Sequence, residues 1–252
     1  MPTLSAPPPA VRTRQRPDPL PPPPGLPAPA TGFVGRTLAD YVQCFALDLS
    51  ALRKRDVLDV AAGASSFAAE ACARGIDAVA VDPHYLDTPD ELAARIAQDD
   101  AHLAAQLRLR RLPAKRLSAI AAAEADRRLA AQRFLADFAA KRFHGRYVGA
   151  SLPRLPFFDA TFDLVLCAHL LFSEAQQFDL DWHLAACREL MRVSAGEARL
   201  HPVIGSDGRP HPGLARLRRE LKAVGLVSEL VRVDGEFLVG NETRFVLKRA
   251  SP

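Results

Sequence analysis

The stretch DVLDVAAGASS, residues 56–66, decides the fold class of this chain. It opens with a short apolar run, which is typical of a buried parallel strand, and continues with small residues and two serines that can begin a helix. Gly75 stands where that helix should end, and residues 78–82, AVAVD, form the next candidate strand. A strand, a helix and a strand in this order predict a βαβ unit with a right-handed crossover.

The alternation of strand and helix resumes in the second half of the chain. Each later segment is predicted from its hydrophobic pattern and the turn residues around it: strands at residues 146–150, 162–168, 197–203, 227–233 and 243–248, and helices at 181–193 and 212–224. The last two strands follow each other closely, so they are expected to pair antiparallel. We therefore predict an α/β fold, Rossmann-like and doubly wound, with a mostly parallel seven-stranded sheet and an antiparallel C-terminal strand.

A helical insertion is predicted after the second strand, over residues 88–143. It starts with Thr88-Pro89-Asp90-Glu91, a capping box with proline at the first helical position. Alanine, leucine and arginine then dominate and Pro113 breaks the pattern, so two or more helices are expected. Three roles stay open: a lid over the ligand site, a structural pair of helices with a solvated basic face, or a grip on nucleic-acid phosphates. The arginines that raise the third role are Arg108, Arg110, Arg111, Arg116, Arg127 and Arg128.

The composition favours one sizeable α/β domain. The chain has 252 residues, 48% of them apolar, and a mild net charge of +4. Residues 1–31 are rich in proline and are expected to form a disordered tail ahead of one folded domain at residues 32–250. Four scattered cysteines argue against a zinc site and a disulfide framework, so no metal is predicted. No apolar run approaches the ~20 residues of a membrane helix. The sequence thus predicts a cytoplasmic protein without a membrane partner and leaves its oligomeric state open.

The ligand site is predicted at the ends of the first two strands. Asp59, Ala61, Gly63 and Ser65 lie where a strand turns sharply into a helix. Small side chains at such a turn let a ligand touch the backbone. Asp82 ends the second strand, nineteen residues after Gly63. An acid at that place can accept hydrogen bonds from both ribose hydroxyls of an adenosine-bearing cofactor.

Two classes of cofactor are considered for this turn. Nicotinamide dinucleotides require G-x-G-x-x-G because their pyrophosphate must approach the backbone, and the three positions here are Ala61, Gly63 and Ser66. S-adenosylmethionine brings no phosphate, so it tolerates small residues other than glycine at two of these positions. The sequence therefore favours S-adenosylmethionine.

At these residues the chain resembles the class I S-adenosylmethionine-dependent methyltransferases. The family's first motif, an acidic residue followed by G-x-G-x-G, aligns with residues 59–65. A Leu-Pro-Phe turn and a Phe-Asp-Leu-Val strand follow at residues 155–157 and 162–165. The resemblance places Ser151 where an acid usually stands beside the adenine, and Leu152 so that its backbone amide faces the ring. It implies S-adenosylmethionine as the cofactor, held by Asp59, Ala61, Gly63, Ser65, Asp82, Pro83, Ser151 and Leu152.

His169 follows the fourth strand, at the sheet edge where ligands bind in open α/β folds. A neutral imidazole there could accept a proton from a nucleophile, pack on the cofactor or bond the backbone. His84 and Tyr85 could border the adenine or the substrate. The resemblance implies methyl transfer by in-line displacement to a small-molecule acceptor. Two alternatives stay open: a non-catalytic cofactor-binding or interaction module, and an RNA or DNA methyltransferase that uses the basic insertion.

Overall fold

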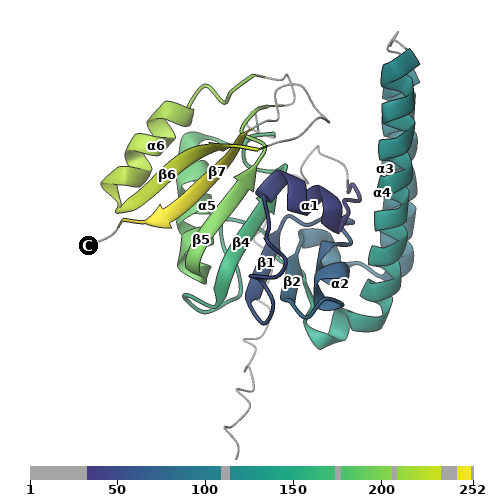
Figure 1. Cartoon of the computed structure of the whole chain (residues 1–252), viewed down its shortest axis with the longest axis horizontal. Helices are drawn as coiled ribbons and strands as arrows, with labels where there is room; N and C mark the ends of the chain where they lie inside the picture. Colours follow the sequence, from purple (N-terminus) through teal and green to yellow (C-terminus); the bar gives the residue numbers. More distant parts are fainter. Residues whose placement is uncertain (1–32, 109–113, 174–176, 206–208, 234–242, 251–252) are drawn as a thin grey trace, which may run out of the picture.

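A seven-stranded sheet forms the centre of the molecule, as the computed structural model shows (Figure 1). The structure describes residues 33–108, 114–173, 177–205, 209–233 and 243–250, so the predicted proline-rich tail lies outside the described residues. The strands follow the order β3-β2-β1-β4-β5-β7-β6. Their bounds are β1 Asp56–Val60, β2 Asp77–Val81, β3 Tyr147–Val148, β4 Phe162–Ala168, β5 Ser194–His201, β6 Leu226–Arg232 and β7 Thr243–Arg249.

The predicted fold class is confirmed. Strands β1 to β5 pair in parallel, whereas β7 runs antiparallel to both β5 and β6. The sheet is therefore doubly wound and Rossmann-like, and its order turns back between β1 and β4. The last strand, β7, does not extend the edge of the sheet but lies between β5 and β6. Because β7 lies at this inner position, its first residues are next to the carboxyl end of β5.

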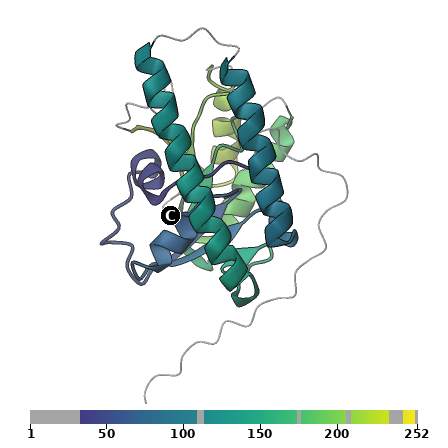
Figure 2. The same ribbon diagram turned by 90° about the vertical axis from the view of Figure 1, so that its right-hand side faces the viewer.

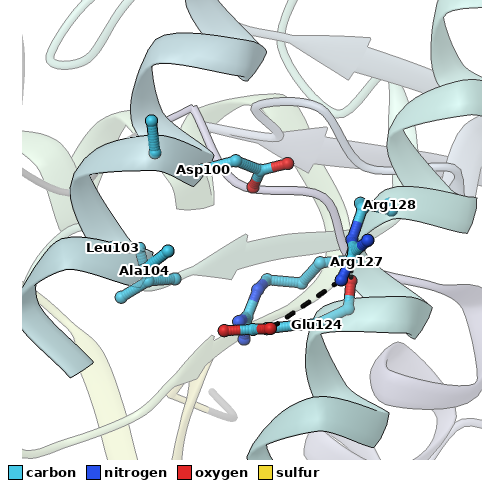
Figure 3. Close-up of a pocket in the computed structure, with 7 residues that line it drawn as sticks. Asp100, Leu103, Ala104, Glu124, Arg127 and Arg128 are labelled. Carbon is cyan, nitrogen blue, oxygen red and sulfur yellow. Dashed lines mark hydrogen bonds and ion pairs between the residues drawn. The ribbon is translucent and has the colours of Figure 1, made fainter. Parts of the chain in front are cut away.

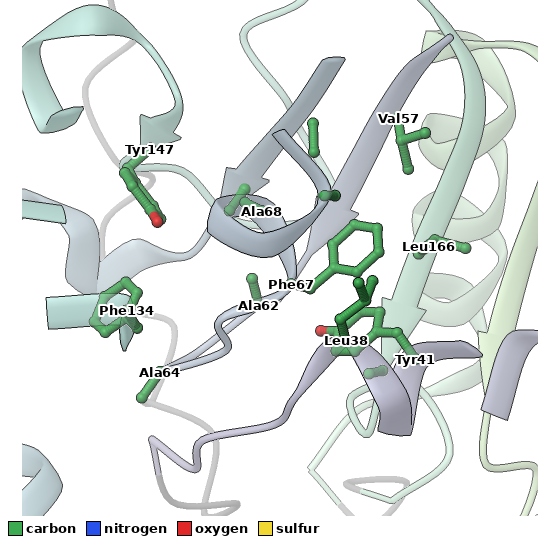
Figure 4. Packing of buried hydrophobic residues seen from close by; sticks show 14 of the residues in the cluster. Leu38, Tyr41, Val57, Ala62, Ala64, Phe67, Ala68, Phe134, Tyr147 and Leu166 are labelled. Carbon is green, nitrogen blue, oxygen red and sulfur yellow. The ribbon is translucent and has the colours of Figure 1, made fainter. Parts of the chain in front are cut away.

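Helices cover both faces of the sheet. They are α1 Leu38–Phe45, α2 Phe67–Cys72, α3 Pro89–Arg108, α4 Ala114–Lys141, α5 Leu180–Val193 and α6 Leu214–Ala223, with 3₁₀ turns η1 Pro83–Leu86 and η2 Arg142–His144. One apolar core joins the sheet to α1, α2 and the inner faces of α3 and α4, and Figure 4 shows part of it. A second core joins the opposite face to α5 and α6. Burying these two apolar surfaces is the main source of stability.

The helical insertion follows β2, as predicted, and consists of α3 and α4. Figures 1 and 2 show the two long helices side by side along the β2 side of the molecule, with one end projecting beyond the sheet. The predicted capping box is present at its start: the backbone amide of Glu91 donates to Thr88 Oγ1 over 3.3 Å, and the amide of Thr88 donates to Glu91 Oε2 over 2.7 Å. The predicted break at Pro113 lies outside the described residues.

Candidate functional site

The carboxyl end of β1 turns through two left-handed residues. Ala61 has φ +57° and Gly63 has φ +59°. The amide of Ala62 donates to the carbonyl of Val81 over 3.1 Å, which fixes the turn against the end of β2. A left-handed alanine costs more than a left-handed glycine, so Ala61 holds a conformation that the local sequence does not favour. Ser65, at the end of the turn, accepts a hydrogen bond from the amide of Phe67 through its hydroxyl, over 3.1 Å.

Asp82 lies against the Gly63 turn, as its position at the end of β2 predicts. Its Oδ2 accepts a hydrogen bond from the Gly63 amide and its Oδ1 accepts one from the His84 amide, both over 3.0 Å. The carboxylate is buried, and burial raises its pKa while the two amides and His84 oppose that rise. Each oxygen keeps a further lone pair, so the carboxylate can still accept hydroxyl groups of a ligand. Pro83 follows at the first position of η1.

Asp59 is a second buried carboxyl group beside the same turn. Its Oδ2 accepts a hydrogen bond from the Tyr41 hydroxyl over 2.8 Å, whereas its Oδ1 is buried and has no hydrogen-bond partner within the described ranges. Burial raises the pKa of Asp59 to about 8, although the Tyr41 hydroxyl and the charge of Arg36 oppose the rise. An unpartnered buried oxygen is costly, and such atoms in native proteins call for an explanation. The turn thus holds a polar atom that the described part of the chain leaves unused.

The segment of residues 33–37, here called the strap, covers the Gly63 turn. A Cβ atom built on Gly63 would lie 3.4 Å from the Val34 carbonyl oxygen, so the strap backbone is in contact with the turn. The Arg36 carbonyl accepts hydrogen bonds from the Ser66 amide over 2.9 Å, the Ser65 hydroxyl over 3.1 Å and the Ser66 hydroxyl over 3.3 Å. The strap is therefore fixed to the start of α2 by three donors.

The outer side of the strap is fixed to the helical insertion. The Phe33 amide donates to Asp99 Oδ2 of α3 over 2.6 Å. A Cβ atom built on Gly35 would lie 2.4 Å from the Arg127 carbonyl oxygen of α4, so only glycine fits between strap and helix. The strap, rather than α3 or α4, is thus the part of the chain that lies directly on the turn. The helices lie outside it.

Tyr85 joins the turn to an aromatic cluster under the insertion. Its hydroxyl donates to the Gly63 carbonyl over 2.7 Å, and its ring stacks on Phe134 at a centroid distance of 5.5 Å. His84 meets the ring of Phe33 edge to face at 5.6 Å. Both residues therefore lie at the predicted site, where Tyr85 has a supporting role on the turn.

Ser151 and Leu152 lie beyond the short strand β3. The amide of Asp82 donates to the Val148 carbonyl over 3.2 Å, so the end of β3 lies beside the end of β2. Ser151 follows three residues later and is partly buried, and the Leu152 side chain is buried in the core under α5. Ser151 itself forms an isolated antiparallel bridge with Arg154. Its role, and that of the Leu152 amide, stay predictions.

His169 directly follows β4 and has a left-handed conformation, with φ +53°. Its amide donates to the His201 carbonyl at the end of β5 over 2.7 Å, and the two rings meet edge to face at 5.9 Å. Burial lowers the pKa of His169 well below its usual value, and the positive charge of Arg36 and the ring of His201 add to this effect. The imidazole is therefore neutral at neutral pH, the form that can accept a proton.

Sequence reasoning missed several residues of this edge. Tyr41 and Arg36 come from the segment before β1, and His201 and Arg244 come from β5 and β7. The residues around Tyr41 do not indicate which carboxyl group its hydroxyl meets, because Asp59 is 18 residues further along the chain. His201 lies at a strand end, and a polar residue at that position, like His169, is a usable signal for a ligand site.

The structure also contains a cavity of about 260 Å³ between α3 and α4 (Figure 3). Its lining includes the ion pair between Arg128 and Glu124, 3.7 Å apart. Among the described residues, no group of three His, Cys, Asp or Glu side chains could hold a metal ion. No helix in that part of the chain is long and apolar enough to cross a membrane.

The fold and this edge define a Rossmann-like α/β domain with a candidate ligand site at the turning point of the sheet. No family model matches the chain. Among curated proteins it is similar to an uncharacterized protein of Methanocaldococcus jannaschii, with 26% identity over 223 residues that cover 87% of this chain and 96% of that protein. The match thus covers nearly the whole of this relative, whose name states no activity.

Two solved structures are similar to this chain in fold. One is magnesium protoporphyrin IX methyltransferase from Synechocystis PCC 6803 with bound S-adenosylmethionine, with 14% identity, a TM-score of 0.46, and coverage of 84% of this chain and 77% of that chain. The other is 1,6-didemethyltoxoflavin-N1-methyltransferase from Burkholderia thailandensis with bound S-adenosylhomocysteine, with 18% identity, a TM-score of 0.45, and coverage of 83% and 77%. The fold of this chain is defined by its own sheet order.

Proposed function

We propose that this chain is an S-adenosylmethionine-dependent methyltransferase that acts on a small-molecule acceptor. The arrangement of two buried carboxyl groups, Asp59 and Asp82, around the left-handed turn at Gly63 carries this proposal. Asp82 would hold the ribose hydroxyls, and the unpartnered Oδ1 of Asp59 would take the amino group of the methionine part. The chain brings no phosphate-binding glycine run to this turn, which supports a cofactor without a pyrophosphate.

The residues present fit such a cofactor. The turn offers small residues at positions 61 to 65, so a ligand can approach the backbone. The Asp82 carboxylate is aligned in advance by two backbone amides, which lowers the entropy cost of binding. Ser151 and the Leu152 amide would border the adenine beside the end of β3. Ala61, Gly63 and Ser65 would line the turn, and Pro83 would limit the site on the far side of Asp82.

The cofactor would supply an activated methyl group, and the chain would align the acceptor and exclude water. The strap and the Tyr85 hydroxyl hold the turn in one conformation, so few groups need to move when a ligand binds. The neutral His169 would accept a proton from an acceptor that has one to lose. Its lowered pKa makes it a weak base, which suits an acceptor atom that loses its proton readily.

The charges of the insertion favour a small molecule over a nucleic acid. Among the described side chains, Arg128 pairs with Glu124 and Arg133 pairs with Glu70 over 3.2 Å. These arginines are therefore partly neutralised, whereas a phosphate-binding face needs free cations. The side chains of Arg108, Arg110, Arg111 and Arg116 lie outside the described residues. The lid predicted for the insertion becomes, in this proposal, a support that holds the strap over the site.

Binding of S-adenosylmethionine to Asp82 variants tests the proposal. Calorimetry on Asp82→Asn should show affinity weaker by about ten- to a hundredfold, because a charge-assisted pair of hydrogen bonds is lost. Asp77→Asn is the matched control, since Asp77 is exposed at the opposite end of the same strand. Unchanged affinity in Asp82→Asn, or a preference of the wild type for NAD, would exclude this site. Tight binding without turnover on any acceptor would favour the non-catalytic module instead.

A further inference from the structure

Four neighbouring strands each present a polar side chain at the carboxyl edge of the sheet. In the order of the sheet they are Asp59 on β1, His169 after β4, His201 at the end of β5 and Arg244 at the start of β7. β1 and β2 hold the proposed cofactor site, so the other three residues extend the edge on the side left for the acceptor. The ring of His201 lies 6.1 Å from that of Phe45, which places this side beneath the end of α1.

Arg244 lies next to His201 by strand register. Leu200 pairs with Phe245, so the next step along the two antiparallel strands brings His201 and Arg244 together. Both Leu200 and Phe245 point into the core under α5 and α6. Since side chains alternate along a strand, His201 and Arg244 share the opposite face, on which α1 lies. Arg244 is therefore a component of the acceptor side.

The guanidinium of Arg244 is incompletely used by the chain. Its Nε and Nη1 atoms are buried and have no hydrogen-bond partner among the residues that the structure describes. Burial lowers the pKa of Arg244, the charge of Arg199 adds to this effect, and Glu197 opposes it. Leaving two donors of a cation buried and unpaired is costly. A ligand that accepts hydrogen bonds at these atoms would remove this cost.

The nearby charges leave a positive balance at this end of the edge. Glu197 is already paired, with Arg199 Nε at 2.6 Å and with Lys248 at 3.4 Å. Arg199 also donates through Nη1 to the Phe45 carbonyl over 2.7 Å. Arg244 has no such carboxylate among the ion pairs of the described residues. This excess of positive charge favours binding of an anion.

We infer that the methyl acceptor carries a carboxylate or phosphate group and that Arg244 binds this group. The inference rests on the proposed methyltransferase function, because it assigns the acceptor side of the same edge. The planar guanidinium fork fits a carboxylate or phosphate with two parallel hydrogen bonds. Neighbouring strands are ~4.8 Å apart, and β5 lies between β4 and β7. The anion bound by Arg244 and the proton acceptor His169 are therefore about 10 Å apart. The acceptor is therefore an extended small molecule with its anionic group remote from the methylated atom.

Anion binding to the unliganded protein tests the inference without any knowledge of the acceptor. Inorganic phosphate and succinate are titrated at constant ionic strength, and the rise in Tm gives an apparent Kd for each. The wild type should bind one of them at least about tenfold more tightly than Arg244→Gln. The preferred anion then distinguishes a phosphate from a carboxylate group. Arg55→Gln is the matched control, because Arg55 is an exposed, ion-paired arginine just before β1, at the opposite edge.

The second part of the test repeats the titration with S-adenosylhomocysteine bound. Retained anion affinity supports a site separate from the cofactor, whereas loss of the anion on cofactor binding would overturn the assignment. Equal affinities in the wild type and Arg244→Gln would overturn it too. Arg244→Lys keeps the charge and should retain part of the affinity, which separates lost binding from lost folding. If S-adenosylhomocysteine does not bind at all, the proposed function fails, while the anion titration still reports on Arg244.

Discussion

On the β1–β2 half of the carboxyl edge, the chain satisfies most of its own polar atoms. Both oxygens of Asp82 accept backbone amides, the Gly63 carbonyl accepts the Tyr85 hydroxyl, and three donors converge on the Arg36 carbonyl. On the β4–β5–β7 half, Arg244 keeps two buried donors without a partner in the described part of the chain, and His169 is held neutral by burial. The first half is preorganised for a constant ligand, whereas the second relies on a ligand to complete it.

The largest expected effect concerns Asp59 Oδ1, a polar atom of the first half that breaks this pattern. The pKa of Asp59 is about 8 in the folded chain, against 3.8 for an ordinary aspartate. Between these values the folded state holds a proton that the unfolded state has lost, so stability should fall as the pH rises. The loss is at most about 1.4 kcal/mol for each pH unit. Asp59→Asn has no proton to lose and should not show it.

Urea unfolding of both proteins at pH 5 and pH 7 measures this difference. The free energy of unfolding of the wild type, relative to Asp59→Asn, should fall by up to about 3 kcal/mol between the two pH values. Asp163→Asn serves as the control, because this carboxylate lies outside the site and pairs with Arg55 over 3.1 Å. A constant difference between wild type and Asp59→Asn would mean that Asp59 is ionised in the folded chain.

The second prediction asks whether the strap keeps the first half preorganised. Gly35→Ala places a methyl group against the Arg127 carbonyl, where the space is 2.4 Å. Displacing the strap should lower the free energy of unfolding by about 1–3 kcal/mol and weaken binding of S-adenosylmethionine. Val34→Ala adds no atom against α4 and is the comparison variant. Chemical denaturation and calorimetry measure the two effects. Wild-type values in Gly35→Ala would show that the strap is not held against the helix.

The smallest effect is expected at Ser151, at the border of the first half. A carboxylate accepts a hydrogen bond from an adenine amino group more strongly than a hydroxyl does. Ser151→Asp should therefore tighten binding of S-adenosylmethionine, by about tenfold or less. Ser151→Asn, which has similar size without the charge, should bind like the wild type. Weaker binding by a folded Ser151→Asp in calorimetry would show that the predicted register with the adenine is wrong.

Most of the fold could be predicted because its signals are local. The apolar runs of β1, β2 and β4, the left-handed Gly75 and the capping box at Thr88 each depend on neighbouring residues. The contact between Gly63 and Asp82 was also predictable, since parallel strands end at the same edge. Boundaries were less certain: β3 is Tyr147–Val148, shorter than the predicted residues 146–150, and β5 begins at Ser194 instead of Glu197.

The missed part of the site depends on long-range packing. The position of β7 between β5 and β6 brings Arg244 beside His201, and no local pattern distinguishes that order from a simple hairpin at the edge. Likewise, the residues around Gly35 do not indicate that it packs against α4, a helix that begins at Ala114. Such contacts join segments far apart in the chain, so they follow from how whole layers pack and not from periodicity.

The strap also sets an order of events during synthesis on the ribosome. Residues 33–36 are the first described part of the chain to emerge, and the serines that they bind follow about 30 residues later. Their other partners come much later, since Asp99 is 66 residues beyond Phe33 and Arg127 lies still further along. At ~5–20 residues per second, translation reaches Arg127 of α4 only about 5–18 s after the strap. The nascent β1–α2–β2 unit must therefore exist for that time without its full cover, and the strap becomes clamped on both sides only when the helical insertion has been made.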